Sequence, residues 1–215
     1  MIILFAKAPV PGRVKTRLLE RFSPEETAEL HTAFVEDTLA MLAELSGRAD
    51  LQLSTDVPTE AWARFHIARR VQVQGDLGAR ILHALAEELA LGRPQAMVLG
   101  SDSPTLPAAH LDKLLTSPAD VALGPAADGG YYAIACRKIH AEMFAGVEWS
   151  GPRALQGTVR AARQCGLTVA LGDTWFDIDT PDDLVRLARS PSLPPRTAAW
   201  LEKRRRDVLG TGHCD

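Results

Sequence analysis

Short apolar segments and longer amphipathic segments alternate along most of the chain. Short, mostly apolar segments bounded by polar or turn residues predict strands. These segments are residues 2–6, 51–54, 71–74, 96–100, 121–123, 131–135 and 168–171. Segments with apolar residues at helical spacing predict helices at residues 24–42, 60–67, 77–91, 110–115, 152–165 and 181–188. This alternation predicts an α/β fold with a mostly parallel central sheet and helices on both faces.

Three of the predicted helices begin at residues typical of helix caps. Ser23 stands three residues before Glu26, which is the spacing of a capping box. Asp76 precedes the helix at residues 77–91, and Thr180 precedes a proline at the start of the last helix. These signals indicate where the helices start and where the loops before them end.

Composition limits the class of protein. The chain has 215 residues, of which 46% are hydrophobic and 24% charged, as expected for one globular domain. Its net charge of −3 does not indicate a nucleic-acid-binding surface, so any phosphate site must come from a local basic cluster. No apolar run approaches the roughly 20 residues that span a bilayer, and the cysteines form no Cys-x-x-Cys pair. We predict a cytoplasmic protein without nucleic-acid or membrane partners, with a single domain at residues 1–189 and a Pro-rich, basic extension at residues 190–215.

A basic segment follows the first predicted strand directly. Four cations, Lys7, Arg13, Lys15 and Arg17, stand within eleven residues, and Gly12 between them permits a turn and a close backbone approach to a diphosphate. Because ligands bind at the carboxyl ends of strands in open α/β sheets, we favour a phosphate-binding loop over a solvated basic loop. The predicted nucleotide and phosphate ligands in this segment are Lys7, Gly12, Arg13, Lys15, Thr16 and Arg17.

The same segment resembles a Walker A loop only superficially. That motif requires a glycine immediately before its lysine, and Val14 stands there instead. An ordinary P-loop ATPase or kinase is therefore disfavoured.

Carboxylates follow two later segments. Asp102 comes just after the predicted strand at residues 96–100, where a carboxylate can hold Mg²⁺ or Mn²⁺ against phosphate oxygens; a turn or capping role is the alternative. Asp177 and Asp179 share one side of an extended segment, and we favour Asp179 as the second metal ligand. Ser103 is assigned to substrate binding.

Further candidates have equally plain structural interpretations. Asp128 can bind a sugar hydroxyl or act as a base, and Gly129 and Gly130 can let a substrate approach, but Asp-Gly is also a strong hairpin signal. Arg80 can contact the phosphates or pair with a carboxylate. Trp149 can stack on a substrate ring or belong to the core.

The motifs together resemble the radical-SAM/selenodomain-associated transferase family, a group within the GT-A-type nucleotide-diphospho-sugar transferases. The matching motifs are Lys-x-Pro-x-Pro-Gly-x-x-Lys-Thr-Arg-Leu from Lys7, Gly-Asp-Leu-Gly-x-Arg, Gly-Ser-Asp-Ser-Pro-Thr-Leu-Pro, Asp-Gly-Gly-Tyr-Tyr, Trp-Ser and Asp-x-Asp-Thr-Pro-Asp-Asp-Leu. The resemblance covers residues 1–189 and implies a Rossmann-like GT-A fold and a divalent metal. By position it also implies phosphate binding by Gly12, Arg13, Lys15 and Arg17 and metal binding by Asp102.

Three functions remain open on the sequence. The leading hypothesis is a metal-dependent glycosyltransferase that uses a nucleotide-diphospho-sugar donor and a small-molecule acceptor, with Lys15, Asp102 and Asp128 as catalytic residues. The alternative is a nucleotidylyltransferase that joins a nucleoside triphosphate to a small phosphorylated metabolite and releases pyrophosphate. The third is a non-catalytic nucleotide-binding module. The oligomeric state, monomer or homodimer, stays open.

Overall fold

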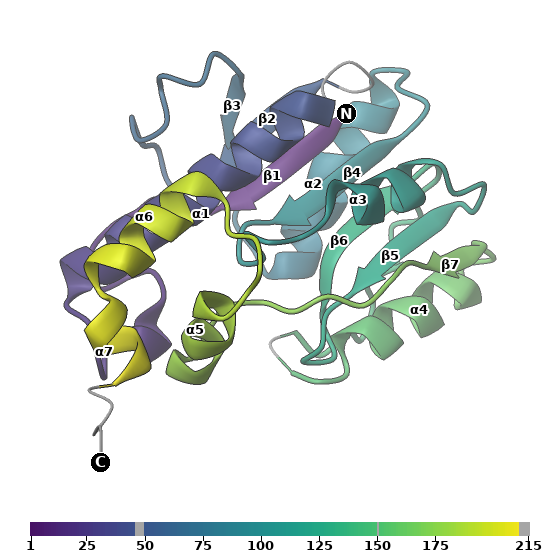
Figure 1. Ribbon diagram of the computed structural model, residues 1–215. Coiled ribbons are helices and arrows are strands. Elements are labelled where there is room, and N and C mark those ends of the chain that lie inside the picture. The colour runs from purple at the N-terminus through teal and green to yellow at the C-terminus, as the bar shows by residue number, and fades with distance from the viewer. Residues whose placement is uncertain (46–49, 150, 211–215) are drawn as a thin grey trace.

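The central feature of the computed structural model is a mixed sheet (Figure 1). The structure describes residues 1–45, 50–149 and 151–210, which contribute seven strands to this sheet in the order β3-β2-β1-β4-β6-β5-β7. The strands are β1 (Ile2–Ala6), β2 (Leu51–Thr55), β3 (Ala68–Val71), β4 (Ala96–Gly100), β5 (Val121–Pro125), β6 (Tyr131–Cys136) and β7 (Val169–Leu171). Within the described residues only β6 runs antiparallel to its neighbours, so the predicted, mostly parallel α/β fold is confirmed.

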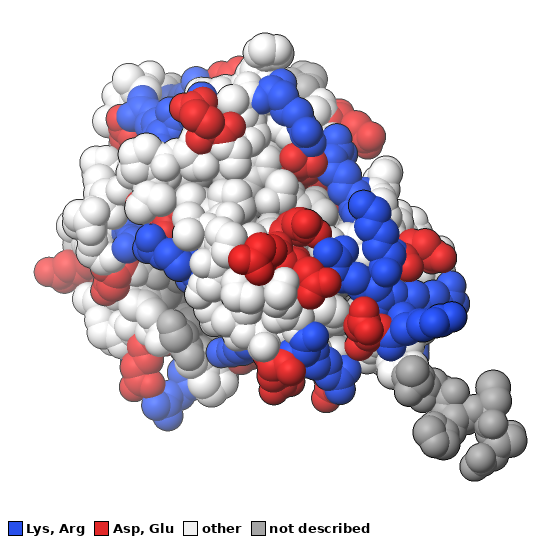
Figure 2. Space-filling view, turned by 90° about the vertical axis from the view of Figure 1, so that its left-hand side faces the viewer, with Lys and Arg blue, Asp and Glu red and all other residues white. Residues whose placement is uncertain are grey.

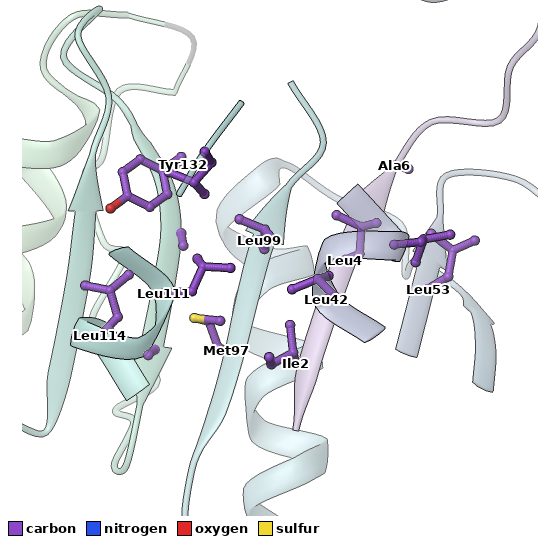
Figure 3. Packing of buried hydrophobic residues seen from close by; sticks show 14 of the residues in the cluster. Ile2, Leu4, Ala6, Leu42, Leu53, Met97, Leu99, Leu111, Leu114 and Tyr132 are labelled. Carbon is purple, nitrogen blue, oxygen red and sulfur yellow. The ribbon is translucent and has the colours of Figure 1, made fainter. Parts of the chain in front are cut away.

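Helices cover both faces because each central strand is apolar on both sides. In β1, Ile2 and Leu4 face a core closed by α1 (Pro24–Leu45) and α3 (Ala108–Leu115), and Figure 3 shows this packing. Ile3 faces the opposite core, which is closed by α2 (Leu77–Ala90) and α4 (Ala154–Gln164). Alternation of side chains along the strand thus places neighbouring residues in two different cores.

A third apolar cluster lies at one end of α1 and includes the C-terminal helices. It joins a short 3₁₀ helix, η1 (Thr16–Leu18), to α5 (Pro181–Ala188), α6 (Pro195–Lys203) and α7 (Arg205–Leu209). Members of this cluster from η1, α1, α5, α6 and α7 are Leu18, Phe34, Leu184, Trp200 and Val208. Within the predicted extension at residues 190–215, the described part therefore packs on α1 and η1.

Charged side chains of both signs lie on the surface near α1 and the C-terminal helices. Figure 2 shows basic side chains along one side of this face with acidic side chains beside them. Arg204 is only 13% exposed, and its guanidinium contacts Glu26 Oε1 at 2.9 Å and Glu29 Oε2 at 2.6 Å. This member of the basic run at residues 203–206 is tied to α1.

The predicted helix starts are confirmed in detail. Ser23 Oγ accepts the Glu26 backbone N–H, and the Glu26 carboxylate accepts the Ser23 N–H. Asp76 caps α2 by accepting the Ala79 N–H, and Thr180 closes a capping box at the start of α5. Among the described residues, no helix combines the length and apolar character needed to cross a membrane.

Two predicted elements are wrong. Residues 60–67 form turns instead of a helix, because Trp62 adopts φ +65° and turns inward to a buried position. The third strand lies at Ala68–Val71, not at residues 71–74. It is an exposed edge strand with two arginines, so it lacks the apolar pattern by which a buried strand is found.

Candidate active site

Two loops meet at the carboxyl ends of neighbouring strands. β1 and β4 pair in parallel, with Phe5 opposite Gly100, so the segments that follow them leave the same edge of the sheet. A third segment joins them after β7, where the Ile178 backbone N–H donates to the Asp102 carbonyl at 2.9 Å. This arrangement brings together the basic loop and the carboxylates that the sequence places far apart.

Lys15 lies at the centre of this junction. Its backbone is left-handed, with φ +47°, and its side chain is 3% exposed. The ammonium Nζ contacts Asp102 Oδ1 at 2.5 Å, Ile178 O at 2.6 Å and Asp179 Oδ1 at 3.2 Å. Burial alone would lower the pKa of Lys15, but the two carboxylates outweigh it and raise this pKa above its ordinary value.

These contacts give the Lys15 side chain a different direction from the one that we predicted. Lys15 was expected to face phosphate directly, whereas its ammonium is turned inward onto Asp102 and Asp179. Burial opposes ionisation of Asp102, yet the charge and hydrogen bond of Lys15 hold the pKa of that carboxyl below its usual range. Lys15 and Asp102 therefore form an ionised pair that Asp179 also contacts, and phosphate binding by Lys15 stays a prediction.

The other cations of the loop point outward. Lys7, Arg13 and Arg17 are exposed, as is Thr16, and Arg17 Nη1 lies 3.6 Å from Asp179 Oδ2. Gly12 has φ +76°, a conformation that favours glycine. The loop thus presents three solvent-facing guanidinium and ammonium groups around one buried ammonium.

A hydrogen-bonded pair of Ser103 and Asp177 lies beside the cluster. Ser103, 6% exposed, donates its hydroxyl hydrogen bond to Asp177 Oδ1. Burial, assisted by the nearby charges of Asp102 and Asp179, raises the pKa of Asp177 to about 6. The Ser103 hydroxyl is thus already bonded to Asp177, and substrate binding by Ser103 stays a prediction.

The donor set fits a hard divalent cation. Asp102 and Asp179 both place a carboxylate oxygen on the same ammonium, so a single cation can contact both, and their side chains are 47% and 39% exposed. Among the described residues no group of three or more His, Cys, Asp or Glu side chains could hold a metal. Mg²⁺ is commonly held by one or two carboxylates plus substrate phosphates, which is the arrangement these two residues offer.

The turn after β5 has a complete structural explanation. Asp128 is exposed, and its Oδ1 accepts the Gly130 N–H at 2.9 Å. Gly129 has φ +92°, and a Cβ there would lie 2.0 Å from the Pro152 carbonyl oxygen. These contacts account for the turn; the predicted substrate roles of Asp128, Gly129 and Gly130 stay predictions.

Arg80 and Trp149 are both engaged within the protein. Arg80 donates to Gly75 O at 3.0 Å and to Gln72 Oε1 at 3.3 Å, and both of these partners are neutral oxygens. Phosphate binding by Arg80 stays a prediction. The half-buried Trp149 packs against Tyr131 and Phe144 and covers Gly78, where a Cβ would lie 2.6 Å from the indole. The contacts of Trp149 match the core interpretation, and its stacking role stays a prediction. Ser150, the other half of the Trp-Ser motif, lies outside the described residues.

Sequence reasoning missed two residues that touch the basic loop. His31 Nε2 lies 2.9 Å from the Lys7 carbonyl oxygen, and Asp56 Oδ1 accepts the Ala8 N–H at 2.6 Å. Burial lowers the pKa of His31. Asp56 directly follows β2, so its place at a strand carboxyl end was a usable signal, whereas His31 lies on the apolar face of α1 and gives none.

Comparison with known proteins decides the family. A family model described as "Uncharacterized protein conserved in bacteria (DUF2064)" matches residues 33–151. The chain belongs to this family. A "3-phospho-D-glycerate guanylyltransferase" from Phenylobacterium zucineum is 33% identical over 194 residues, covering 82% of this chain and 85% of the relative. A "2-phospho-L-lactate guanylyltransferase" from Methanocella arvoryzae is 27% identical over 190 residues, covering 84% and 79%.

Among solved structures, this DUF2064 member resembles a protein from Desulfovibrio desulfuricans G20 that is provisionally assigned as a nucleotide-diphospho-sugar transferase. The two share 34% identity with a TM-score of 0.86, over 96% of this chain and 95% of the other. The fold class is thereby confirmed, and the chain is an enzyme of the transferase class. The names of the curated relatives support the predicted alternative, nucleotidylyl transfer, over the leading hypothesis of glycosyl transfer.

Proposed function

We propose that this protein transfers a nucleoside monophosphate group from a nucleoside triphosphate to the phosphate of a small phosphorylated carboxylic acid. A phosphate oxygen of the acceptor attacks the α-phosphorus and forms a new P–O bond. The bond from that phosphorus to the α,β-bridging oxygen breaks, and pyrophosphate leaves with the electron pair. GTP is the first donor to test, because two relatives are named guanylyltransferases.

One observation carries the proposal: the Lys15 ammonium holds Asp102 and Asp179 together beneath a loop with exposed Lys7 and Arg13. The exposed cations of the loop would hold the β- and γ-phosphates and stabilise the charge that develops on the leaving pyrophosphate. Lys15 would fix the orientation of the two carboxylates through its contacts with both. A triphosphate donor needs this density of cations more than a diphosphate donor does.

Asp102 and Asp179 are the residues that would hold Mg²⁺ or Mn²⁺. The ion, when bound, supplies charge neutralisation at phosphate oxygens. The chain's own contribution is to direct both carboxylates to one point, which the Lys15 ammonium does through its contacts with Asp102 and Asp179.

The test is pyrophosphate release from each of the four nucleoside triphosphates with Mg²⁺ and either 3-phospho-D-glycerate or 2-phospho-L-lactate. We expect release with at least one pair, and a fall in kcat of about 10²–10³-fold in Asp102→Asn, the scale seen when one group that stabilises transition-state charge is lost. The matched control is Asp173→Asn, an exposed carboxylate paired with Lys113, which should stay within about twofold of wild type. Absence of pyrophosphate release with every pair would refute the proposal.

Glycosyl transfer from a nucleotide-diphospho-sugar is the second candidate, favoured by the assignment of the Desulfovibrio structure. Release of a nucleoside diphosphate from a nucleotide-sugar, without pyrophosphate release from any triphosphate, would support it. Membership of the radical-SAM/selenodomain-associated transferase family and a cytoplasmic location stay predictions.

A further inference from the structure

One peptide unit at the start of the basic loop is held on both sides by side chains. The carbonyl of Lys7 and the N–H of Ala8 belong to the same peptide plane. His31 Nε2 lies 2.9 Å from that carbonyl oxygen, and Asp56 Oδ1 accepts that N–H at 2.6 Å. The two side chains come from different elements, α1 and the residue after β2, so they reach the plane from separate directions.

The histidine is itself held in place. His31 is 4% exposed, and because its partner is a carbonyl, Nε2 must carry the hydrogen in this contact. Its ring meets Trp62 edge to face, with centroids 6.1 Å apart and an interplanar angle of 74°. Trp62 is 4% exposed with φ +65°, a strained conformation for a bulky residue. Such strain persists only where surrounding contacts hold it, and the contact with His31 is one of them.

The same face of α1 also supports the far end of the loop. Phe34 follows His31 by three residues, so both lie on one side of the helix. The Lys15 ammonium lies over the Phe34 ring, 5.3 Å from its centroid. One helix face thus contacts the loop at Lys7 and at Lys15, before and after the exposed turn at Gly12.

We propose that His31 and Asp56 are positioning residues that fix the Lys7–Ala8 peptide plane and thereby the phosphate-binding shape of residues 7–17. The plane sets the direction in which the chain leaves β1. A rotation of the plane would move Lys7 and Arg13 relative to Lys15, which is anchored separately. The effect on nucleotide binding rests on the proposed function; the effect on loop order does not.

The experiment compares paired variants of the full chain. His31→Phe keeps an aromatic ring against Trp62 but removes the donor, whereas His31→Gln keeps an N–H near the position of Nε2. Asp56→Ala removes the acceptor, whereas Asp56→Asn retains a carbonyl oxygen that can accept the Ala8 N–H. Thr32→Val is the control on α1, because the Thr32 hydroxyl donates to the Ala28 carbonyl of its own helix.

Two readouts separate positioning from general stability. The first is hydrogen–deuterium exchange of residues 8–18 in the free protein, and the second is the dissociation constant for nucleoside triphosphate, with KM and kcat measured separately. We expect His31→Phe and Asp56→Ala to speed exchange in the loop and to weaken triphosphate binding by about 3–10-fold, the loss of one hydrogen bond. The Gln and Asn variants should lie closer to wild type, with all melting temperatures within a few degrees.

The outcomes are distinguishable. If wild type binds no triphosphate, the proposed function fails, and the exchange data still decide whether the tether exists. If His31→Phe exchanges and binds like wild type, the positioning role is wrong. Equal losses in His31→Phe and His31→Gln, accompanied by equal falls in melting temperature, would show that His31 is only a packing residue.

Discussion

At the scale of single residues, Lys15 determines the character of the site. Its ammonium carries one positive charge against the two negative charges of Asp102 and Asp179, so the cluster retains negative charge. Lys15 is buried, whereas both carboxylates are partly exposed. A divalent cation can therefore approach the carboxylates from the solvent side while the lysine holds them from the protein side.

If the Lys15 ammonium is removed, a divalent cation should take its place in balancing the charge of Asp102 and Asp179. Lys15→Met leaves two carboxylates facing each other, so without metal we expect a loss of about 1–3 kcal/mol in the free energy of unfolding. This is less than the ~3–5 kcal/mol typical of a fully buried pair, because water screens these carboxylates. Mg²⁺ should restore part of the loss, and it should raise the melting temperature of the variant more than that of wild type. Melting curves with EDTA and with Mg²⁺ measure both effects.

Lys113→Met is the control for Lys15→Met. Its pair with Asp173 is exposed on both sides, so its removal should cost at most about 0.5 kcal/mol and leave the response to Mg²⁺ unchanged. An identical response to Mg²⁺ in Lys15→Met and wild type would mean that the cluster does not bind the ion.

At the scale of elements, the sequence predicted best where a strand is buried or a helix is capped. β1 and β4 are continuous apolar runs and begin and end as predicted, and α2 and α5 begin at their predicted caps. β3 was misplaced because a four-residue exposed edge strand carries no apolar pattern. The turns at residues 60–67 were read as a helix because spacing cannot reveal that Trp62 has a positive φ.

The candidate site was likewise predictable in part: the location of its loops follows from the strands, whereas the direction of its side chains does not. The loop after β1 and the Asp102 loop follow two strands that pair in parallel, so both lie at the same edge of the sheet, where open α/β sheets bind ligands. The inward direction of Lys15 depends on its left-handed backbone, and the contacts of His31 depend on how α1 packs. Both are properties of tertiary structure, so a single sequence could not supply them.

The edge of the sheet at β7 offers a test of pH dependence. Asp120 accepts the Thr168 N–H at 2.9 Å and the Thr168 hydroxyl at 2.7 Å, and Lys138 Nζ lies 2.8 Å away. The hydrogen bond with Lys138, followed by those from Thr168, holds the pKa of Asp120 below its usual ~3.9. Because the folded pKa is the lower one, the stability from this carboxylate is present above about pH 4 and is lost as pH falls through the folded pKa.

Asp120→Asn should therefore melt a few degrees below wild type at pH 7, with a gap that narrows steadily below pH 4. Asp120→Ala, which also loses the hydrogen bonds from Thr168, should melt below Asp120→Asn at every pH. Thermal melts at pH 7, 4 and 2.5 measure the gap. A gap that stays constant over this range would show that the charge of Asp120 does not stabilise the fold.

At the scale of the whole molecule, the C-terminal helices complete the fold on the side of the basic loop. α6 packs along α1 (Figure 1), and its N-terminus is fixed by Asp37, whose Oδ2 accepts the Thr197 N–H and hydroxyl, each at 2.7 Å. The third apolar cluster includes Leu18 of η1. Residues more than 170 positions apart along the chain, such as Glu26 and Trp200, are thereby joined by a hydrogen bond of 3.1 Å.

Trp200 is the residue through which this docking is best tested. Its ring is 5% exposed, lies 5.2 Å from the Phe22 ring and carries the Arg204 guanidinium at 4.6 Å. Trp200→Ala should cost about 3–5 kcal/mol, because it removes a large buried ring and leaves a cavity. Trp200→Phe should lose less, whereas Leu91→Ala, at a position 67% exposed, should stay within about 0.5 kcal/mol of wild type.

The same substitution tests whether the C-terminal helices support the loop as well as the fold. Because Leu18 and Trp200 share one cluster, loosening α6 should increase hydrogen–deuterium exchange in η1, and Arg17 in η1 is one of the proposed phosphate ligands. We therefore expect Trp200→Ala to weaken nucleoside triphosphate binding at temperatures well below its own melting point. Unfolding curves, exchange in residues 16–18 and a dissociation constant at low temperature measure the three effects. Faster exchange confined to α6 and α7, with unchanged exchange in η1 and unchanged binding, would mean that the helices stabilise the molecule without ordering the loop.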